Sequence, residues 1–305
     1  MSPRAERTMV DPVEFTSYYG QPILKEPAWK QPDVPLYLFL GGAAGSSATM
    51  ASLADLTGRP ALARVGRLVA AAGAGASVVA LIHDLGRPAR FLHMLRVLKP
   101  TSPLSVGSWI LAPFSGLAAA SAGSAETGLL RPIGKLAGAA AGVAGPAMCT
   151  YTAVLLADTA TPSWHEARGH LPFLFAGSAL TSGAGAALIA APRDEVGPVV
   201  SAGLVGAAAE LVVARQLEHG LGVVSEPYRT GRAGKLLKAA RGLTAAGAAL
   251  SLAARRSKVA AVASGAAYLA AGLCTRFGVY QAGVESAKDP KYVVVPQRER
   301  MAERG

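Results

Sequence analysis

"VPLYLFLGGAAGSSATMASLA" occupies residues 34–54 and contains no charged side chain. In an α-helix these 21 residues, at about 1.5 Å each, reach roughly 30 Å, the thickness of the hydrocarbon core of a bilayer. The rest of the chain agrees, because 51% of its 305 residues are hydrophobic and 16% are charged, against about 25% in soluble domains. The stretch therefore predicts an all-α integral membrane protein.

The same length rule predicts seven further membrane spans, some of them flanked or interrupted by charged residues. The eight predicted spans cover residues 34–54, 61–83, 101–125, 136–157, 171–192, 196–218, 235–254 and 257–280. We expect them to form two four-helix bundles in a membrane domain over 34–284, between a polar N-terminal segment (1–33) and a polar C-terminal tail (285–305). An even number of spans places both termini on the same side of the membrane.

The predicted spans are poor in leucine and rich in Ala, Gly and Ser, as in "AAAGAGASVVA" (70–80) and "GSALTSGAGAALIAA" (177–191). In lipid, small residues at four-residue spacing allow helix backbones to approach closely. A genome of high GC content also favours Ala and Gly codons. Both explanations stay open on the sequence alone.

Composition argues against several classes of protein. Cys149 and Cys274 are the only cysteines, too few for an iron–sulfur cluster and without zinc spacing. All five histidines lie at span ends or in loops, so we expect no haem and no metal in the chain. The net charge of +11 comes without a basic stretch interleaved with aromatics, which argues against nucleic-acid binding. Residues 1–33 lack the apolar core of a secretion signal, so the first span is expected to direct insertion.

Charge is distributed unevenly between the two predicted membrane faces. The side of the termini carries 20 Lys and Arg residues and all five histidines, against nine Lys and Arg on the opposite side. The positive-inside rule would place both termini in the cytoplasm. A face with histidines and carboxylates at the membrane boundary suits proton exchange with a ligand that lives in the bilayer.

The connection "HDLGRPARFLHMLRVLKPTSPLSVGSW" (83–109) contains many of the ionisable residues of the terminal side. His83 and Asp84 close the second span, Pro88 fits the first turn of a helix, and residues 90–99 read as a short amphipathic helix at the interface. The basic residues of the connection are Arg87, Arg90, Arg96 and Lys99. We expect a basic, wet rim beside an apolar pocket.

Extended to Leu111, this connection resembles the signature of the NrfD/polysulphide reductase family of membrane subunits. The resemblance covers nearly the whole chain and rests also on "VPLYLFLGGAAGSS" (34–47), "TPSWHEARGHLPFLF" (161–175), "SEPYRTG" (225–231) and "TRFGVYQAGVESAKDPKYVVVPQR" (275–298). It implies a multi-pass subunit of the cell membrane, not catalytic alone, that exchanges electrons between a membrane quinone and a partner.

The quinone would be exchangeable menaquinone or ubiquinone. The partner would be a ferredoxin-like iron–sulfur subunit, normally of a molybdopterin oxidoreductase. Family members differ in the side that the partner occupies, so the orientation stays open.

On this resemblance, residues of the terminal face become candidates for quinone binding and proton transfer. They are His83, Asp84, Trp109, Tyr151, Asp158, Trp164, His165 and Glu166. Oxidising a quinol releases two protons with two electrons, which requires an acid–base pair with an exit to water, as His83 and Asp84 provide. The Tyr151 phenol can hydrogen-bond a quinone carbonyl. The structural alternatives are an Asp84 ion pair with Arg87 or Arg90, and aromatic residues that only anchor helices at the interface. The four basic residues of the rim are candidates for partner docking.

Glu210 lies well inside the sixth predicted span, where an ionisable group is costly and usually functional or paired. With Arg276 it can form a polar path through the second bundle. This feature suits a rival function, a secondary transporter or proton channel, but the sequence shows no pair of interrupted spans in corresponding halves. A purely structural anchor without quinone contact is a third possibility.

Overall fold

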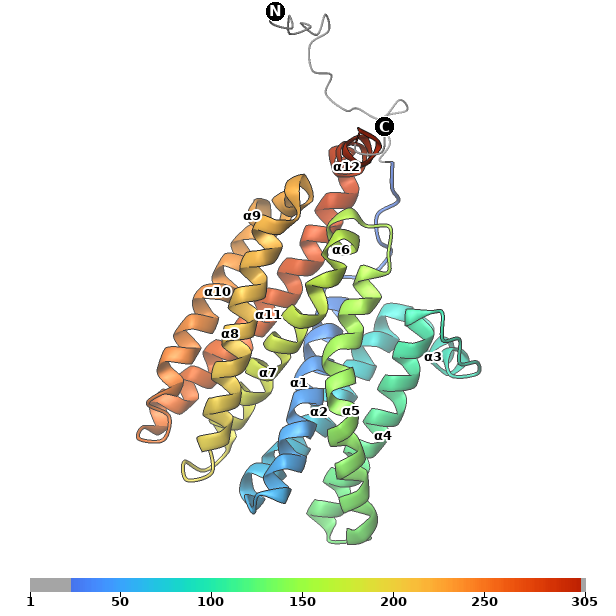
Figure 1. Ribbon diagram of the computed structural model, residues 1–305. Helices are drawn as coiled ribbons and strands as arrows, with labels where there is room; N and C mark the ends of the chain where they lie inside the picture. Colours follow the sequence, from blue (N-terminus) through green and yellow to red (C-terminus); the bar gives the residue numbers. More distant parts are fainter. Residues whose placement is uncertain (1–22, 303–305) are drawn as a thin grey trace, which may run out of the picture.

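The computed structural model describes residues 23–302, so most of the predicted polar N-terminal segment lies outside the described residues. The described chain is all-α, as predicted (Figure 1). Its long helices are α1 (Asp33–Leu56), α2 (Pro60–Leu85), α4 (Pro103–Thr127), α5 (Arg131–Ala157), α7 (Leu171–Ala190), α8 (Gly197–Gly220), α10 (Gly231–Ser251) and α11 (Lys258–Lys288). Each of them overlaps one predicted span.

Six of these helices in the described part of the chain are long and apolar enough to cross a membrane: α2, α4, α5, α7, α8 and α11. α1 and α10 do not belong to this set, so the predicted count of eight spans is not confirmed. α10 carries Arg232, Lys235, Lys238 and Arg241 in its first half. α1 is rich in Gly and Ser and is enclosed by its neighbours, since 16 of its 24 residues are buried.

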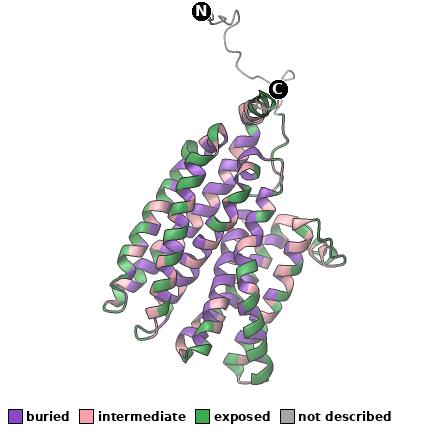
Figure 2. Ribbon diagram, viewed as in Figure 1, coloured by how far each residue is buried: buried purple, intermediate pink, exposed green. Residues whose placement is uncertain are grey.

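The long helices pack as two groups of four. α1, α2, α4 and α5 form the first bundle, and α7, α8, α10 and α11 form the second. The two bundles join where α7 packs against α1 and α5, and α11 also packs against α1. Buried residues follow the inner faces of the helices and exposed residues follow the outer faces (Figure 2).

Glycines on α5 explain how closely the first bundle packs. A Cβ on Gly138 would lie 2.6 Å from the Ser121 Oγ of α4, and a Cβ on Gly142 would lie 2.1 Å from the Ser52 Oγ of α1. Real Cβ atoms are not found so close to other atoms. At Gly142 the Ser52 Cβ would lie at 2.6 Å as well, so the helices would have to move apart, whereas at Gly138 the Ser121 hydroxyl would have to rotate away. Small residues at four-residue spacing therefore have a packing role here, whatever codon usage adds.

The two ends of the molecule differ. At the end near the described termini lie the short elements α3 (Ala89–Met94), α6 (Pro162–Glu166), η1 (Ala167–Gly169), η2 (Gly222–Ser225), α9 (Glu226–Arg229) and α12 (Lys291–Ala302). In Figure 1, α6, α9 and α12 lie at the top, whereas α3 projects sideways at a lower level. The opposite end has only short turns. The predicted polar tail thus contains a helix, α12.

The interface helix predicted over residues 90–99 is shorter than expected, because α3 ends at Met94. The Ser105 hydroxyl donates a hydrogen bond to the Val97 carbonyl (3.1 Å) and accepts one from the Lys99 N–H (3.0 Å). These bonds hold the backbone after α3 in a non-helical path. No residue of α3 is buried, which agrees with a position at the surface.

Candidate functional site

An imidazole–carboxylate pair lies where α1 begins and α2 ends. The Nδ1 atom of His83 is 2.7 Å from the Oδ2 atom of Asp33. The His83 side chain is 75% exposed, whereas that of Asp33 is only 14% exposed. The imidazole of the pair is therefore open to the surroundings, whereas its carboxylate partner is shielded.

Asp84 is placed beside this pair but has a different partner. Its Oδ1 atom accepts a hydrogen bond from the Lys30 backbone N–H (2.7 Å), and the Lys30 Nζ donates to the His83 carbonyl (3.4 Å). Asp84 thus ties the segment before α1 to the end of α2. The alternative ion pair with Arg87 or Arg90 is not formed, and the Arg90 guanidinium donates to the Leu85 carbonyl (2.9 Å).

An open groove of about 450 Å³ adjoins His83. Its lining consists of Lys30, Val79, Ile82, His83, Gly86 and Pro88. Val79 is 67% exposed on the outer side of α2, so one wall of the groove is apolar and faces the lipid side. The volume lies in the range of small-molecule sites, roughly 300–1,000 Å³. The groove combines an apolar wall with a titratable imidazole.

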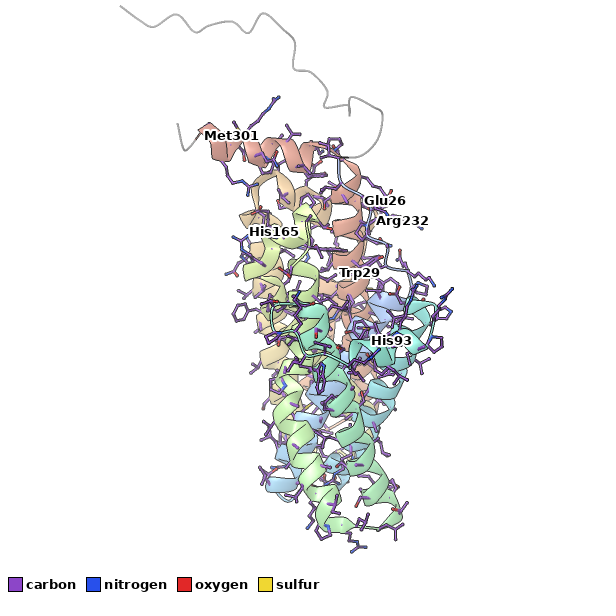
Figure 3. The ribbon with its side chains drawn as sticks, turned by 90° about the vertical axis from the view of Figure 1, so that its right-hand side faces the viewer. Glu26, Trp29, His93, His165, Arg232 and Met301 are labelled. Atoms are coloured by element: carbon purple, nitrogen blue, oxygen red, sulfur yellow. The ribbon has the colours of Figure 1, made fainter. Side chains whose placement is uncertain are left out.

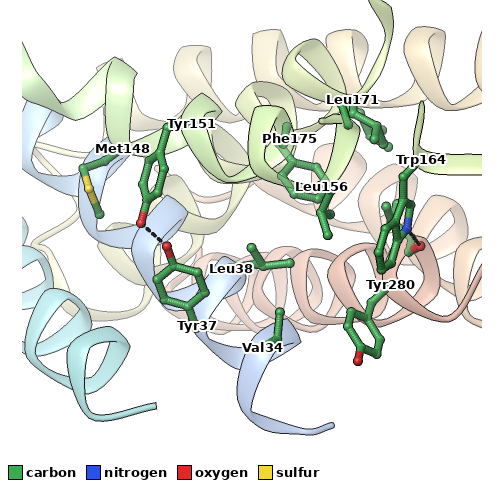
Figure 4. Packing of buried hydrophobic residues seen from close by; sticks show 14 of the residues in the cluster. Val34, Tyr37, Leu38, Met148, Tyr151, Leu156, Trp164, Leu171, Phe175 and Tyr280 are labelled. Atoms are coloured by element: carbon green, nitrogen blue, oxygen red, sulfur yellow. Dashed lines mark hydrogen bonds between the residues drawn. The ribbon is translucent and has the colours of Figure 1, made fainter. Parts of the chain in front are cut away.

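Tyr151 lies in the interior of the first bundle, where its hydroxyl is hydrogen-bonded to the Tyr37 hydroxyl of α1 (Figure 4). Gly107 of α4 packs on the Tyr151 ring, since a Cβ there would lie 2.8 Å from the ring Cε2. Ser77 of α2 donates to the Tyr37 carbonyl (3.1 Å). All four helices of the first bundle therefore meet at this tyrosine pair. It lies one helical turn, roughly 6 Å along α1, deeper than Asp33.

Two hydroxyl groups that share one hydrogen bond use only one of their two protons. No other hydrogen bond involves either hydroxyl within residues 23–302, so one O–H donor stays available. Buried donors normally have a partner. The pair can donate a hydrogen bond to an incoming carbonyl oxygen.

Trp109 and Asp158 are more exposed than the tyrosine pair. The Trp109 side chain on α4 is 40% exposed. Asp158 is an exposed residue at the C-terminal cap of α5. Neither side chain forms a hydrogen bond to another described residue, and the structure does not bring them into contact with His83. Their predicted roles stay predictions.

Trp164 is completely buried at the junction of α6 with α11. Its Nε1 donates to the Val279 carbonyl (2.8 Å), and its ring centroid lies 5.7 Å from that of Tyr280 (Figure 4). The Trp29 ring stacks on it with the same centroid distance of 5.7 Å. A Cβ on Gly283 would lie 1.9 Å from the Trp164 Cε2. The ring is therefore enclosed by protein, and it holds the segment before α1 against α11.

His165 and Glu166 follow Trp164 on α6 but lie at the surface. The Glu166 carboxylate pairs with Arg300 of α12 (3.0 Å), and the His165 Nε2 is 3.4 Å from the Arg168 guanidinium. Figure 3 places His165 closer than His93 to the end of the molecule that α12 covers. The predicted residues of the terminal face are thus divided between two levels, the end of α2 and the α6 region.

The cations of the predicted rim all lie around α3. Arg87, Arg90, Arg96 and Lys99 are exposed. None of these four side chains forms an ion pair with a carboxylate of residues 23–302. Their positive charge is therefore not neutralised locally and is available to an acidic partner.

Glu210 of α8 is buried at the centre of the second bundle. Its Oε1 accepts a hydrogen bond from Thr275 of α11 (2.7 Å), and its Oε2 accepts from Thr181 of α7 (3.3 Å) and Thr244 of α10 (3.4 Å). One threonine from each of the other three helices thus holds the carboxylate. These donors satisfy a group that would otherwise be costly inside a membrane.

Arg276 neighbours Thr275 on α11 and points to the junction between the bundles. Its guanidinium donates to the Phe175 carbonyl (3.0 Å) and the Leu38 carbonyl (3.4 Å), and its Cζ lies 3.8 Å from the centroid of the Phe175 ring. Arg276 forms no direct ion pair with Glu210 in the described part of the chain. Its Nη1 is buried without a hydrogen-bond partner in the described part of the chain.

Sequence reasoning missed several members of these clusters. Asp33 and Tyr37 pair with the predicted residues His83 and Tyr151, and three threonines surround Glu210. The available signals were weak: an acidic residue at the start of a span, and hydroxyl groups within apolar helices. Which of many such residues face one another depends on the rotation of each helix.

A family model described as "Polysulphide reductase, NrfD" matches residues 26–195, which is more than half of the chain. The matched region includes the whole first bundle, the groove beside His83 and the tyrosine pair. No curated protein matches the chain.

Proposed function

The chain belongs to the polysulphide reductase NrfD family, and from this premise we propose that it is the quinol- or quinone-binding membrane subunit of a multi-subunit oxidoreductase. Family membership and six apolar helices make it a multi-pass membrane protein. In the proposal, it resides in the cell membrane and exchanges electrons between membrane quinone and an iron–sulfur partner. It is not catalytic alone.

The proposal includes eight membrane spans. α1 and α10 have 24 and 21 residues, long enough to cross about 30 Å of hydrocarbon. α1 is surrounded by α2, α5, α7 and α11, so its Gly and Ser residues face protein. Arg232, Lys235 and Lys238 lie in the first two turns or so of α10, from where long side chains can reach the membrane surface, and Arg241 in the middle of the helix is paired with Glu218 of α8.

The observation that carries the proposed function is the groove of about 450 Å³ beside His83. Val79 and Ile82 offer an apolar surface for the ring and isoprenoid chain of a quinone. The His83 imidazole, held by Asp33, offers the base that oxidation of a quinol requires. Since His83 is largely exposed, a proton taken from quinol has a direct exit to water.

The other candidate residues receive roles around this groove. The free hydroxyl proton of the Tyr37–Tyr151 pair orients a quinone carbonyl one turn deeper in the bundle. Asp84 positions the segment around Lys30 over the groove. Trp109 forms part of the aromatic belt of α4. The direction of electron flow, and whether the substrate is menaquinone or ubiquinone, do not change these roles.

Electrons leave or enter through a docked partner. The unpaired cations around α3 provide a positive surface for a ferredoxin-like iron–sulfur subunit, itself joined to a molybdopterin oxidoreductase subunit. His165 and Glu166 belong to the higher level formed by α6 and α12, which offers a second contact for the same partner. In this arrangement the partner contacts both the surface around α3 and the surface formed by α6 and α12.

A proton-conducting role is favoured by one specific observation, the carboxylate of Glu210 held by three threonines. With Arg276 it forms a buried polar connection from the centre of the second bundle to the junction with the first. In our proposal, this polar path conducts protons while the complex oxidises or reduces quinone. A stand-alone transporter is the alternative.

The experiment compares His83→Ala, Asp33→Asn and His93→Ala in the assembled complex. His93 is also an exposed histidine of this region, but its imidazole has no hydrogen-bond partner among the described residues and does not line the groove. We expect the first two variants to lower quinone-coupled turnover about 100-fold or more, within the range of general acid–base catalysis, with unchanged assembly. Turnover of the His93 variant should equal that of the wild type. Equal turnover in all three variants would remove the groove from the mechanism.

A further inference from the structure

A cleft opens at the end of the first bundle opposite the described termini. Its larger part, about 560 Å³, lies between α1 and α5, and its smaller part, about 210 Å³, lies between α2, α4 and α5. Lys135 lines both parts. A narrow space lies between the two parts. Asp55 lines both this space and the larger part, and Arg67 lines both this space and the smaller part. The two parts are therefore adjacent at the end of the bundle, with Lys135 in the lining of both and the Asp55–Arg67 ion pair between them.

The smaller part of the cleft is positively charged. Arg67, Arg131 and Lys135 line it. Arg67 is paired with Asp55, whereas Arg131 and Lys135 form no ion pair with any carboxylate that the structure describes. These three cations and one carboxylate leave a net charge of +2. The charge is complementary to a phosphate group.

A buried hydroxyl adds an independent indication of a ligand. Ser121 lines the smaller part of the cleft, is only 3% exposed, and its Oγ has no hydrogen-bond partner in the part of the chain with described coordinates. Its neighbour Ser124 in the same lining donates to the Leu129 carbonyl (2.6 Å). An unsatisfied buried donor is unfavourable, so an acceptor oxygen in the cleft would stabilise it.

The larger part of the cleft is apolar and faces outward. Leu53, Leu56 and Val143 line it and are 56%, 83% and 84% exposed, respectively. α5 is one of the helices able to span a membrane, so this exposed surface meets acyl chains. Along α5, Lys135 precedes Val143 by eight residues, roughly 12 Å. The cations thus lie near the start of the span and the apolar surface lies deeper, in the same order as the headgroup and acyl chain of a phospholipid.

We propose that this cleft binds one anionic phospholipid. The phosphate lies on Arg131 and Lys135 with the Ser121 hydroxyl as a further donor, and an acyl chain follows Leu53 and Val143. The net positive charge selects an anionic lipid over a zwitterionic one. This inference does not depend on quinone chemistry, which was assigned to the opposite end of the molecule.

The test measures lipid binding to the detergent-purified full-length protein by native mass spectrometry, with phosphatidylglycerol, phosphatidylethanolamine and inorganic phosphate as separate probes. We expect phosphatidylglycerol to bind at least about 10-fold more tightly than phosphatidylethanolamine. Arg131→Gln together with Lys135→Gln should remove this preference. Ala139→Phe, which fills the apolar part without changing charge, should weaken binding independently.

The matched control is Arg255→Gln together with Arg256→Gln, the same loss of charge at the same end of the molecule but on the second bundle. This control should keep the lipid preference. Equal binding of both lipids by the wild type would overturn the proposal. So would binding of inorganic phosphate as tight as that of phosphatidylglycerol, because the apolar groove would then contribute nothing. Should the double variant not fold, the Ala139→Phe variant alone decides: unchanged phosphatidylglycerol binding overturns the proposal.

Discussion

The Tyr37 hydroxyl of α1 is hydrogen-bonded to the Tyr151 hydroxyl of α5, and both rings are buried among the four helices of the first bundle. One hydroxyl proton of the pair has no acceptor within the described residues. Such a donor costs about 1–3 kcal/mol when it stays unpaired in a protein interior. A carbonyl oxygen that reaches the pair gains this hydrogen bond, which makes the pair the deepest polar feature of the proposed quinone site.

Removing either hydroxyl tests this role. Tyr151→Phe and Tyr37→Phe preserve the packing of the rings and should lower quinone-coupled turnover about 10-fold, the effect of one lost hydrogen bond. Tyr268→Phe is the control, because Tyr268 is a completely buried tyrosine of the second bundle whose hydroxyl has no hydrogen-bond partner among the described residues. Steady-state quinol oxidation by the assembled complex measures the difference. A Tyr268 variant as impaired as the other two would contradict the assignment.

The carboxylate of Glu210 should be important for stability. Glu210→Leu leaves the Thr244 and Thr275 hydroxyls without an acceptor, whereas Thr181 still donates to the Ser178 carbonyl (2.9 Å). At about 1–3 kcal/mol for each unsatisfied hydroxyl, we expect a loss of about 2–6 kcal/mol. Glu210→Gln keeps an acceptor oxygen and should cost less, about 1 kcal/mol. Thermal unfolding in detergent measures both variants. The control is Glu299→Leu on the exposed helix α12, which should not change the unfolding temperature.

The same Glu210→Gln variant tests the polar path. If the second bundle conducts protons during turnover, the variant should lower proton uptake into proteoliposomes while quinone oxidation by the solubilised complex stays close to that of the wild type. Equal proton uptake by both proteins would exclude Glu210 from proton movement and leave it a structural role.

The packing around Trp164 predicts the effect of a single methyl group. Gly283→Ala would place a Cβ 1.9 Å from the Trp164 ring, so the ring and the attached segment around Trp29 must move. We expect a destabilisation of at least about 1–3 kcal/mol, as for overpacked cores. Gly123→Ala has open space around the new methyl group and should be stabilising by about 0.5–1 kcal/mol. Unfolding temperatures that fall equally in both variants would contradict this packing argument.

The cations around α3 should determine partner binding. Arg87→Glu together with Arg90→Glu reverses the local charge and should reduce co-purification of the iron–sulfur subunit, with the deficit depending on salt concentration. The control reverses Arg255 and Arg256 at the opposite end, where no partner is proposed. Quantitative co-purification at two salt concentrations measures the effect. Retention of the partner by the α3 variant would place the docking surface elsewhere, for example on α6 and α12.

Much of the fold follows from local sequence. A helix in a bilayer must satisfy its backbone hydrogen bonds internally, so an uncharged run of sufficient length is a helix almost regardless of its neighbours. This is why each long helix overlaps a predicted span. The length of α3 was not predicted in this way, because the backbone of Val97 and Lys99 is held in a non-helical path by the Ser105 side chain, a contact that an amphipathic pattern does not show.

The tertiary structure alone decided which polar groups meet. Trp164 and His165 are adjacent in sequence, yet one is completely buried and the other is exposed. Tyr37 and Tyr151 are 114 positions apart and share a hydrogen bond, and Glu210 meets threonines of three other helices. In lipid, apolar side chains gain nothing from facing a protein interior, so hydropathy does not encode the rotation of a helix. That rotation is set by close contacts such as those of Gly138 and Gly142, and these contacts exist only when the helices are assembled.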